Sequence, residues 1–379
     1  MARAGFAGTW SWMQVELRRQ VELAIPMILI NVLSFTVPTI SVMFVGHISE
    51  LALSGASLAS SITNVTGLSL LAQSIVIPVV VCFTCTVCCH VPLCYALVFT
   101  MGLESRGAAL ATSISTFINM LLLGSYVRWA TSCEQTRAPF SLKAFHDLKG
   151  FLKLAIPSAL MMCLEWWSYE ALIIISGWLP NPELETSVIS ICYNCAVFAF
   201  MVPSGLGAMA STRVANELGG GRPDAARRAV YVSAGVASFE AILVSIFFVS
   251  LRNELGKLYS KDEEAIVYIA KMMPILAVYS MLDSIQGLLS GIARGCGWQK
   301  GGAYINLASY YGVGLPVAFV LAFVFHIKAE GLWLGINSGA VVQLIALIAI
   351  TWASDWTKEA KKAVGRLTLP QDVSEPLLK

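Results

Sequence analysis

The longest stretch of the chain without Asp, Glu, Lys or Arg runs from Leu51 to Leu103 and reads LALSGASLASSITNVTGLSLLAQSIVIPVVVCFTCTVCCHVPLCYALVFTMGL. A helix needs about 20 apolar residues to cross the roughly 30 Å of hydrocarbon in a bilayer. The stretch is too long for one span, so it predicts two, 51–72 and 75–100, joined by a minimal turn near Gln73–Ser74. It indicates a chain that crosses a membrane.

The composition of the whole chain indicates the same class. Of its 379 residues, 57% are hydrophobic and 13% are charged, with a net charge of +2 and a mean hydropathy of +0.72. Soluble domains are about 25% charged, so this chain has too few charges to cover soluble domains. A cytosolic enzyme and a disordered protein are excluded, and the missing basic surplus excludes a nucleic-acid partner. We expect an integral protein of the lipid bilayer.

Eight further apolar runs of span length bring the predicted total to ten. Gly, Ser and Ala are frequent in these runs, which favours helices packed on helices over a β-barrel. Lys and Arg are concentrated in loops on the side that holds both termini, so both termini are expected in the cytoplasm. The predicted fold is therefore an all-α polytopic membrane protein with about ten transmembrane helices. The eight runs are 21–44, 107–127, 154–178, 187–209, 229–251, 266–293, 303–325 and 331–353.

An internal repeat divides the chain into two halves. Leu23–Pro26 (LAIP) recurs as Leu154–Pro157, 131 positions later, whereas Gly107 matches Gly331 at a spacing of 224. The two spacings differ by 93 residues, which predicts that the first half has lost about two helices near Leu71–Gln73. Both halves enter the membrane from the same side, as expected for parallel repeats that form two lobes around a midplane cavity.

These patterns give the expected domain organisation. The complete half should be the second one, and the charged tail should be mobile. The expected segments are a cytoplasmic N-terminal segment (1–20), a truncated four-helix lobe (21–127), a cytoplasmic inter-lobe loop (128–153), a six-helix C-terminal lobe (154–353) and a cytoplasmic tail (354–379).

Acidic residues inside the predicted spans are the main functional candidates. An ionisable group within a helical bundle is costly, so it is a functional hypothesis by default. Such a carboxyl can bind and release a proton or attract a cationic substrate. The sequence places no buried basic residue beside these acids. There are four of them: Glu165, Glu170, Glu240 and Asp283.

The neighbours of two acids suggest a site for organic cations. Glu165 shares a helical face with Tyr169 and is next to Trp166 in the sequence. An acid beside these two aromatic rings suits a flat organic cation, through charge and cation–π contact. A carboxyl bonded to a neighbouring helix is the structural alternative for Glu165, and Asp283 also has a structural alternative. For Glu170 and Glu240, function and packing both stay open. The other residues that could line the cavity are Tyr193, Asn194, Gln286 and Tyr310.

Other patterns are discounted. Cysteines near His90 mimic metal-ligand spacing but lie within one uninterrupted apolar run, where buried thiols behave as small hydrophobes. The sequence shows no phosphate-binding motif and no nucleophile set, so neither an enzyme nor a cofactor is expected. The cysteines concerned are Cys82, Cys85, Cys88 and Cys89.

The sequence resembles the multidrug and toxic compound extrusion (MATE) transporters of the plant detoxification type. The similarity extends over roughly residues 15–365. The blocks that carry it are Val42–His47, Leu53–Ala59, Lys153–Glu170, Pro180–Pro182, Ala210–Gly219, Ser290–Lys300 and Gly331–Gly335.

The resemblance implies two six-helix lobes and export of small organic compounds, such as secondary metabolites and xenobiotics, in exchange for protons. The proton-coupling acids of the family correspond here to Glu165 and Asp283. After Leu71 the chain departs from the family, because the rest of helix two and helices three and four are absent. An alternative function follows: a truncated, transport-deficient isoform that associates with a full-length homologue. The membrane is expected to be the plasma membrane or the vacuolar membrane.

Overall fold

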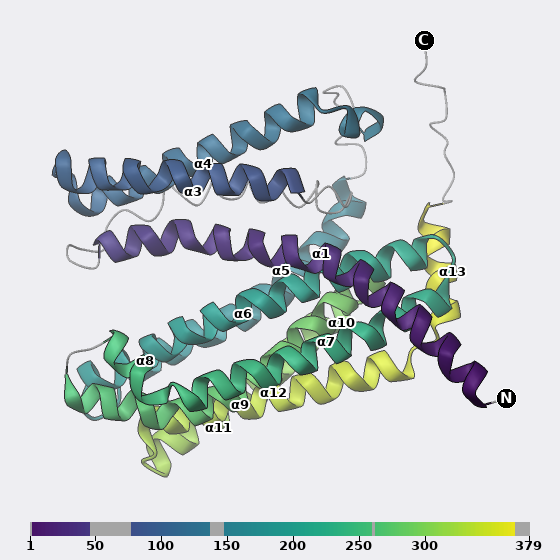
Figure 1. The fold of residues 1–379 in the computed structure, drawn as a ribbon. Helices are drawn as coiled ribbons and strands as arrows, with labels where there is room; N and C mark the ends of the chain where they lie inside the picture. The colour runs from purple at the N-terminus through teal and green to yellow at the C-terminus, as the bar shows by residue number, and fades with distance from the viewer. Residues whose placement is uncertain (1, 46–76, 137–147, 260–261, 368–379) are drawn as a thin grey trace. The chain divides into compact units, whose positions relative to one another are not determined.

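The structure is a computed structural model that describes residues 2–45, 77–136, 148–259 and 262–367. Within these ranges every regular element is a helix (Figure 1), which confirms the predicted all-α class. The elements are α1 (Ala2–Val45), α3 (Ile77–Tyr95), η1 (Ala96–Thr100), α4 (Glu104–Trp129), η2 (Thr131–Thr136), α5 (Leu148–Ser176), α6 (Pro182–Gly219), α7 (Pro223–Ser250), α8 (Arg252–Tyr259), α9 (Glu263–Cys296), α10 (Gln299–Asn306), η4 (Leu307–Gly314), α11 (Leu315–Phe319), η5 (Val320–Val324), α12 (Lys328–Ala353) and α13 (Trp356–Leu367).

Eight stretches of the described chain are long and apolar enough to cross a membrane, and they match eight of the ten predicted spans. Two of the stretches are α3 with η1, and α10 through η5; the other six are α4, α5, α6, α7, α9 and α12. The predicted span 21–44 lies within α1. The predicted span 51–72 lies outside the described residues.

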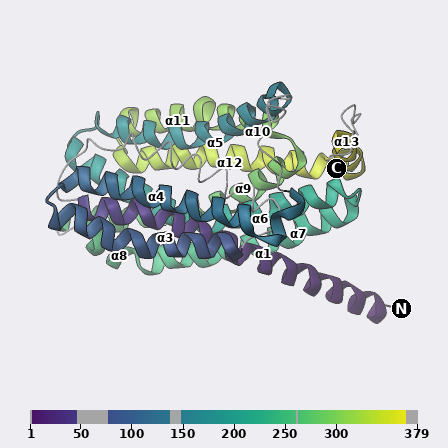
Figure 2. The same ribbon diagram turned by 90° about the horizontal axis from the view of Figure 1, so that it is seen from above.

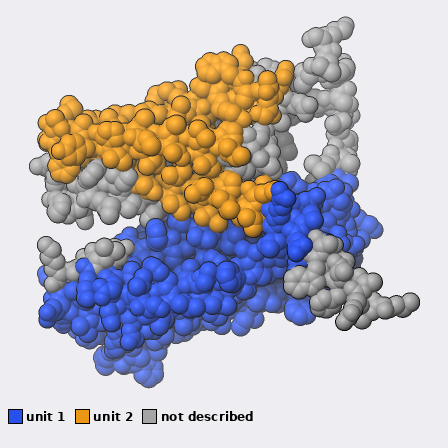
Figure 3. Space-filling model, in the orientation of Figure 1, with its two compact units in different colours: residues 1–20, 147–379 blue, residues 21–146 orange. Residues whose placement is uncertain are grey.

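The helices form two compact units, residues 1–20 with 147–379 and residues 21–146 (Figure 3). In the smaller unit, α3 and α4 pack around Cys94, Leu97 and Ala111. In the larger unit, α9 is central and contacts α6, α7 and α12 (Figures 1 and 2). Residues 1–20, expected as a separate segment, therefore belong with the larger unit.

The repeat predicted at a spacing of 224 is visible in the local structure of each unit. Helix α4 and helix α12 have the same bounds after this shift, and so do the π-helical segments η1 and η5. Gly102 (φ +63°) and His326 (φ +57°), which also differ by 224, both have left-handed backbones. The equivalent bonds Met101 N→Ala96 O and Phe325 N→Val320 O are 2.8 and 3.1 Å long. The two segments, one in each unit, therefore have the same local backbone structure.

Helices α6 and α9 meet along a seam of small residues. A Cβ atom on Gly207 would lie 2.7 Å from the carbonyl oxygen of Gly287, and one on Gly295 would lie 2.6 Å from that of Ser211. A Cβ on Gly291 would overlap the backbone of Gly207. Small residues at such a contact let two membrane helices approach to backbone distance. This seam holds α9 directly against α6.

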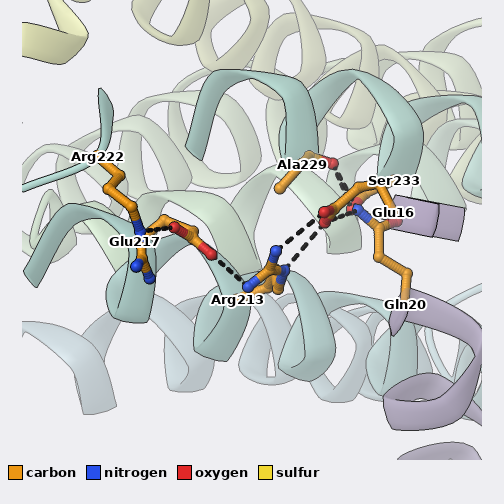
Figure 4. A network of polar contacts seen from close by, with 7 residues as sticks. All are labelled: Glu16, Gln20, Arg213, Glu217, Arg222, Ala229 and Ser233. Atoms are coloured by element: carbon orange, nitrogen blue, oxygen red, sulfur yellow. Dashed lines mark hydrogen bonds and ion pairs between the residues drawn. The ribbon is translucent and has the colours of Figure 1, made fainter. Parts of the chain in front are cut away.

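A polar network joins the N-terminal part of α1 to α6 and α7 within the larger unit (Figure 4). Arg213 donates from Nε and Nη2 to the two carboxylate oxygens of Glu16, each at 2.9 Å, and also pairs with Glu217. Gln20, only 1% exposed, donates to the carbonyl oxygen of Ala229 at 2.9 Å. Ser233 and Arg222 complete the network.

Part of the expected mobile tail is an ordered helix. Residues 356–367 form α13, and Asp355 caps it by accepting hydrogen bonds from the backbone N–H groups of Thr357 (3.0 Å) and Lys358 (3.2 Å). These backbone N–H groups and the Lys358 charge lower the pKa of Asp355. The prediction overlooked this cap, a common sign of a helix start. Residues 368–379 lie outside the described part of the chain.

Candidate functional site

A pocket in the larger unit lies between α5, α6 and α9 and is partly open. Both proton-coupling candidates, Glu165 on α5 and Asp283 on α9, line it. The other lining residues are Trp166, Tyr169, Tyr193, Ala196, Val197, Phe200 and Tyr279.

Helix α9, which carries Tyr279 and Asp283 into the pocket, has a defined cap at each end. Asp262 accepts from the backbone N–H groups of Glu264 and Ala265 and starts the helix. Gly297, with φ +84°, ends it, and this left-handed conformation favours glycine. Between these caps Tyr279 and Asp283 are four residues apart, so they lie on the same face of the helix.

The Glu165 carboxylate is held from α9. Gln286 Nε2 donates to Glu165 Oε1 at 2.7 Å, and the buried Tyr310 hydroxyl donates to Gln286 Oε1 at 3.3 Å. Arg294, half-buried near the end of α9, interacts electrostatically with Glu165. Among the described residues no ion pair within 4.0 Å joins these two side chains, so the expectation that no basic residue lies directly beside the acids stays a prediction.

Asp283 is more deeply enclosed. It is 4% exposed, and within the described residues its Oδ1 atom has no hydrogen-bond partner. Tyr279 contacts both the Asp283 carboxyl and the Tyr169 hydroxyl. The Asp283 carboxyl also interacts electrostatically with Glu165. Two acids in one pocket can hold a proton, or neutralise a bound cation.

An aromatic cluster lies at the site, and its members Tyr169, Tyr193 and Tyr279 line the pocket. Tyr169 is surrounded by Tyr193, Tyr279, Tyr310 and Trp333, with ring centroids between 5.9 and 6.4 Å from its own. Such rings present faces to a flat or cationic molecule. The pocket therefore combines apolar contact area with two carboxyl groups.

Four expected cavity residues do not line the pocket. Glu170 is exposed and does not line the pocket, because one residue beyond Tyr169 turns it about 100° around the helix. Asn194 is exposed, and its amide donates to the carbonyl oxygen of Ser190 in its own helix at 2.9 Å. Glu240 lies on α7, outside the pocket, with both carboxylate oxygens buried. Gln286 and Tyr310 lie behind Glu165 instead of in the pocket wall.

Sequence reasoning missed several polar residues near the site. Tyr279 could have been found, because it lies one helical turn before Asp283. Asn306 and Gln343 could not, since their contacts join distant helices. Gln343 donates to Asn306 at 2.7 Å, and Asn306 donates to the carbonyl oxygen of Met161 at 2.6 Å. In the part of the chain that the structure describes, no cluster of His, Cys, Asp and Glu could hold a metal ion.

Comparison with known proteins shows close plant relatives. Protein DETOXIFICATION 16 of Arabidopsis thaliana is 40% identical over 97% of this chain and 94% of its own length. Protein DETOXIFICATION 13 of the same organism is 45% identical over 297 residues, which cover 78% of this chain and 62% of the relative. The alignment with DETOXIFICATION 16 spans 458 positions, and this chain has 379 residues, so at least 79 positions of the alignment have no residue here.

Solved structures of MATE proteins have the same fold as this chain. The crystal structure of the eukaryotic MATE transporter AtDTX14 superposes with a TM-score of 0.87 at 33% identity, over 94% of this chain and 99% of that one. A crystal structure of MATE in complex with MaL6 shares the fold, with a TM-score of 0.73 at 14% identity over 93% of this chain and 97% of that one. The MatE family profile matches residues 157–320. The chain therefore belongs to the MatE (MATE) family of membrane transporters.

Proposed function

We propose that the chain is a proton-coupled antiporter that exports organic compounds. The observation that carries the proposal is that Glu165 and Asp283, from α5 and α9, line one pocket with aromatic walls. When both acids are ionised, the pocket attracts a cationic or amphipathic compound. When they take up protons, this attraction is lost and the compound is released. Alternating these two states across a membrane exchanges protons for the substrate.

The pocket supports a substrate class without naming a compound. Trp166, Tyr169 and Phe200 offer apolar faces, and the two carboxyl groups supply negative charge. Flat organic cations and amphipathic secondary metabolites or xenobiotics match these two features in charge and polarity. Sodium would need several oxygen ligands around one point, so we favour protons as the coupling ion.

Neutral variants in proteoliposomes test the proposal. Glu165→Gln and Asp283→Asn should each abolish export driven by an imposed pH gradient. Glu170→Gln is the matched control, because it changes an exposed acid of the same helix outside the pocket and should leave export unchanged. Normal export by both pocket variants would refute the role of these acids. Export driven by a sodium gradient alone would refute proton coupling.

Two further features belong to the same proposal. The distribution of Lys and Arg supports cytoplasmic N- and C-termini. The plasma membrane and the vacuolar membrane are both suitable locations, since a pH gradient exists across each. A fluorescent fusion in plant cells, combined with protease access to tagged termini, tests both points. A terminus outside the cytoplasm would contradict the orientation.

A second candidate function is a transport-deficient isoform that associates with a full-length homologue. It is favoured by the 79 or more alignment positions without a residue in this chain. The match with DETOXIFICATION 13 covers 297 alignment positions and 78% of the 379 residues of this chain. The number of positions and the number of matched residues are nearly equal, so this match contains almost no gap. A place for the missing positions near one end of the chain agrees with this match, and the repeat spacing supports a place near Leu71–Gln73.

Flux and binding measured on the same protein separate the two candidates. An antiporter exports the compound without a partner. The isoform would show no export when it is as abundant in the membrane as a full-length relative, such as DETOXIFICATION 16, that does export. Both candidates predict pH-dependent binding of an organic cation, which quenching of tryptophan fluorescence can follow. Co-purification with a full-length homologue and absence of flux would favour the isoform.

A further inference from the structure

The basic residues of the larger unit are concentrated at the end where α12 stops and α13 begins. Near the opposite end the described acidic residues outnumber the basic ones. That opposite end contains Glu183, Glu185, Glu254, Asp262, Glu263, Glu264 and Glu330 against Arg252, Lys257, Lys271 and Lys328. The α13 end contains Arg222, Arg227, Arg228, Lys300, Lys358, Lys361 and Lys362 against Glu217, Asp224, Asp355 and Glu359. The two ends of the unit therefore differ in the sign of their surface charge.

Helix α13 lies across the ends of the long helices instead of parallel to them (Figures 1 and 2). Its apolar side faces the protein: Ala360 is 4% exposed, and the rings of Trp356 and Trp298 are 6.3 Å apart. A Cβ on Gly221, in the α6–α7 turn, would lie 3.9 Å from Val364. The helix is thus docked on the ends of α6 and α7, and its orientation is fixed.

The opposite side of α13 is a row of lysines. Lys358, Lys361 and Lys362 are spaced by three and four residues, so they share one face of the helix. The Lys358 and Lys362 side chains are 76% and 62% exposed, and Lys361 is exposed as well. Arg222, 64% exposed, follows the glycine that Val364 approaches. We name these four residues the α13 basic face.

Arg222 pairs with the buried Glu217, whereas the lysines are only partly paired. Lys358 lies 3.4 Å from Asp355 and Lys362 lies 2.7 Å from Glu359, both as pairs three residues apart on the helix surface. The Lys358–Asp355 pair is exposed and contributes little to stability, so an external anion can replace its carboxylate, whereas Glu359 is only 11% exposed. Long lysine side chains can also reach toward a headgroup while their stems stay on the helix.

The position of the face relative to the membrane favours a lipid over a soluble anion. Trp352, in the last turn of α12, is 87% exposed, and tryptophan is enriched at the boundary between hydrocarbon and water. Helix α13 starts one turn later, so its basic face is at headgroup level. Clusters of basic residues on an amphipathic helix directly after a span bind anionic lipids.

We propose that the α13 basic face binds the headgroups of anionic phospholipids in the leaflet at which α12 ends. The negative phosphate and carboxylate groups of such a leaflet complement the three lysines and Arg222. The contact is independent of the transport pocket, which lies between other helices of the unit. Its expected consequence is retention of a ring of anionic lipid by the protein and greater stability in an anionic membrane.

Lipid titration of the purified full chain tests the proposal. The protein in mild detergent is titrated with phosphatidylserine or phosphatidylcholine, while bound lipid is counted by native mass spectrometry and the unfolding temperature is measured. The triple variant Lys358→Gln, Lys361→Gln, Lys362→Gln should bind phosphatidylserine at least about tenfold more weakly, since each lysine near an anionic surface contributes roughly fivefold. Raising the salt toward 1 M should remove the difference, because screening shortens to about 3 Å.

Two further variants keep the outcome informative. Arg252→Gln, Lys257→Gln, Lys271→Gln removes the same charge at the opposite end and should bind phosphatidylserine like the wild type. Replacing the three α13 lysines by arginine keeps the charge and should preserve binding. This variant shows whether weaker binding by the glutamine variant comes from the lost charge or from misfolding. Equal phosphatidylserine binding by the wild type and the glutamine variant would overturn the proposal. So would a wild type that binds both lipids equally, a result expected if the face instead serves an acidic protein.

Discussion

The seam between α6 and α9 makes the larger unit sensitive to a single methyl group. Gly291→Ala would place a Cβ inside the backbone of Gly207, where no side-chain rotation can relieve the overlap. Ordinary contact begins near 3.4 Å, so the two helix backbones would have to separate. Because α9 also carries Asp283 and Gln286, the same displacement would move two groups of the site.

The size of the effect follows from two opposing terms. Overpacking a filled contact costs up to about 3 kcal/mol, and the upper value applies because the neighbouring atoms are backbone. Replacing glycine by alanine within a helix gains about 1 kcal/mol. The net loss is about 2 kcal/mol, which corresponds to a decrease of about 4–8 °C in the unfolding temperature for a unit of this size.

The measurement compares two alanine variants of the purified protein by thermal denaturation. Gly235→Ala on α7 is the matched control, because a Cβ there has no atom within 4 Å and the residue is exposed. It should be as stable as the wild type or slightly more stable, through helix propensity alone. If Gly291→Ala unfolds at the same temperature as Gly235→Ala, the close contact between α6 and α9 does not exist.

Three further outcomes are expected. Glu16→Gln removes the charge that Arg213 binds through two hydrogen bonds and should lower the free energy of unfolding by about 2 kcal/mol, measured by denaturation. Burial raises the pKa of Glu16, but the hydrogen bonds and charge of Arg213 outweigh it and hold that pKa below 4.5. The difference between wild type and Glu16→Gln should therefore be constant above pH 4.5 and decrease only as the pH falls through the lowered pKa, and a loss already complete at pH 6 would contradict the assignment. Gly107→Ala and Gly331→Ala should destabilise the protein by similar amounts, since the added Cβ atoms would lie 2.6 and 2.8 Å from backbone atoms. Gly124→Ala is the control, because a Cβ there would meet open space. Unequal effects of the first two variants in a melting assay would argue against equivalent repeats.

The sequence predicted the helices well where the physical signal is local. Apolar run length locates the hydrocarbon-crossing part of a helix, so eight predicted spans have counterparts. It does not locate the ends that continue into water: α6 extends to Gly219, beyond the predicted end at residue 209. The π-helical segments η1 and η5 were also not predicted, because an extra residue per turn leaves no mark in hydropathy.

The site was predictable only in part, and the reason is geometric. Glu165 and Asp283 could be selected because an acid within an apolar span is unusual by itself. Helical spacing also linked Tyr169 to Glu165, and it could have linked Tyr279 to Asp283. Contacts between helices, such as Gln343 with Asn306 or Arg294 near Glu165, depend on rotation and depth of packing, which one sequence does not give.

The location of the pocket bears on both proposed functions. Among the described residues, those that line the pocket all come from α5, α6 and α9 of the larger unit. If the missing positions lie near residue 72, their loss leaves the two acids and their aromatic neighbours in place. Under the isoform proposal, what the loss would remove is part of the first half of the chain. Binding and transport are then separable properties, and retained binding without flux would favour the isoform.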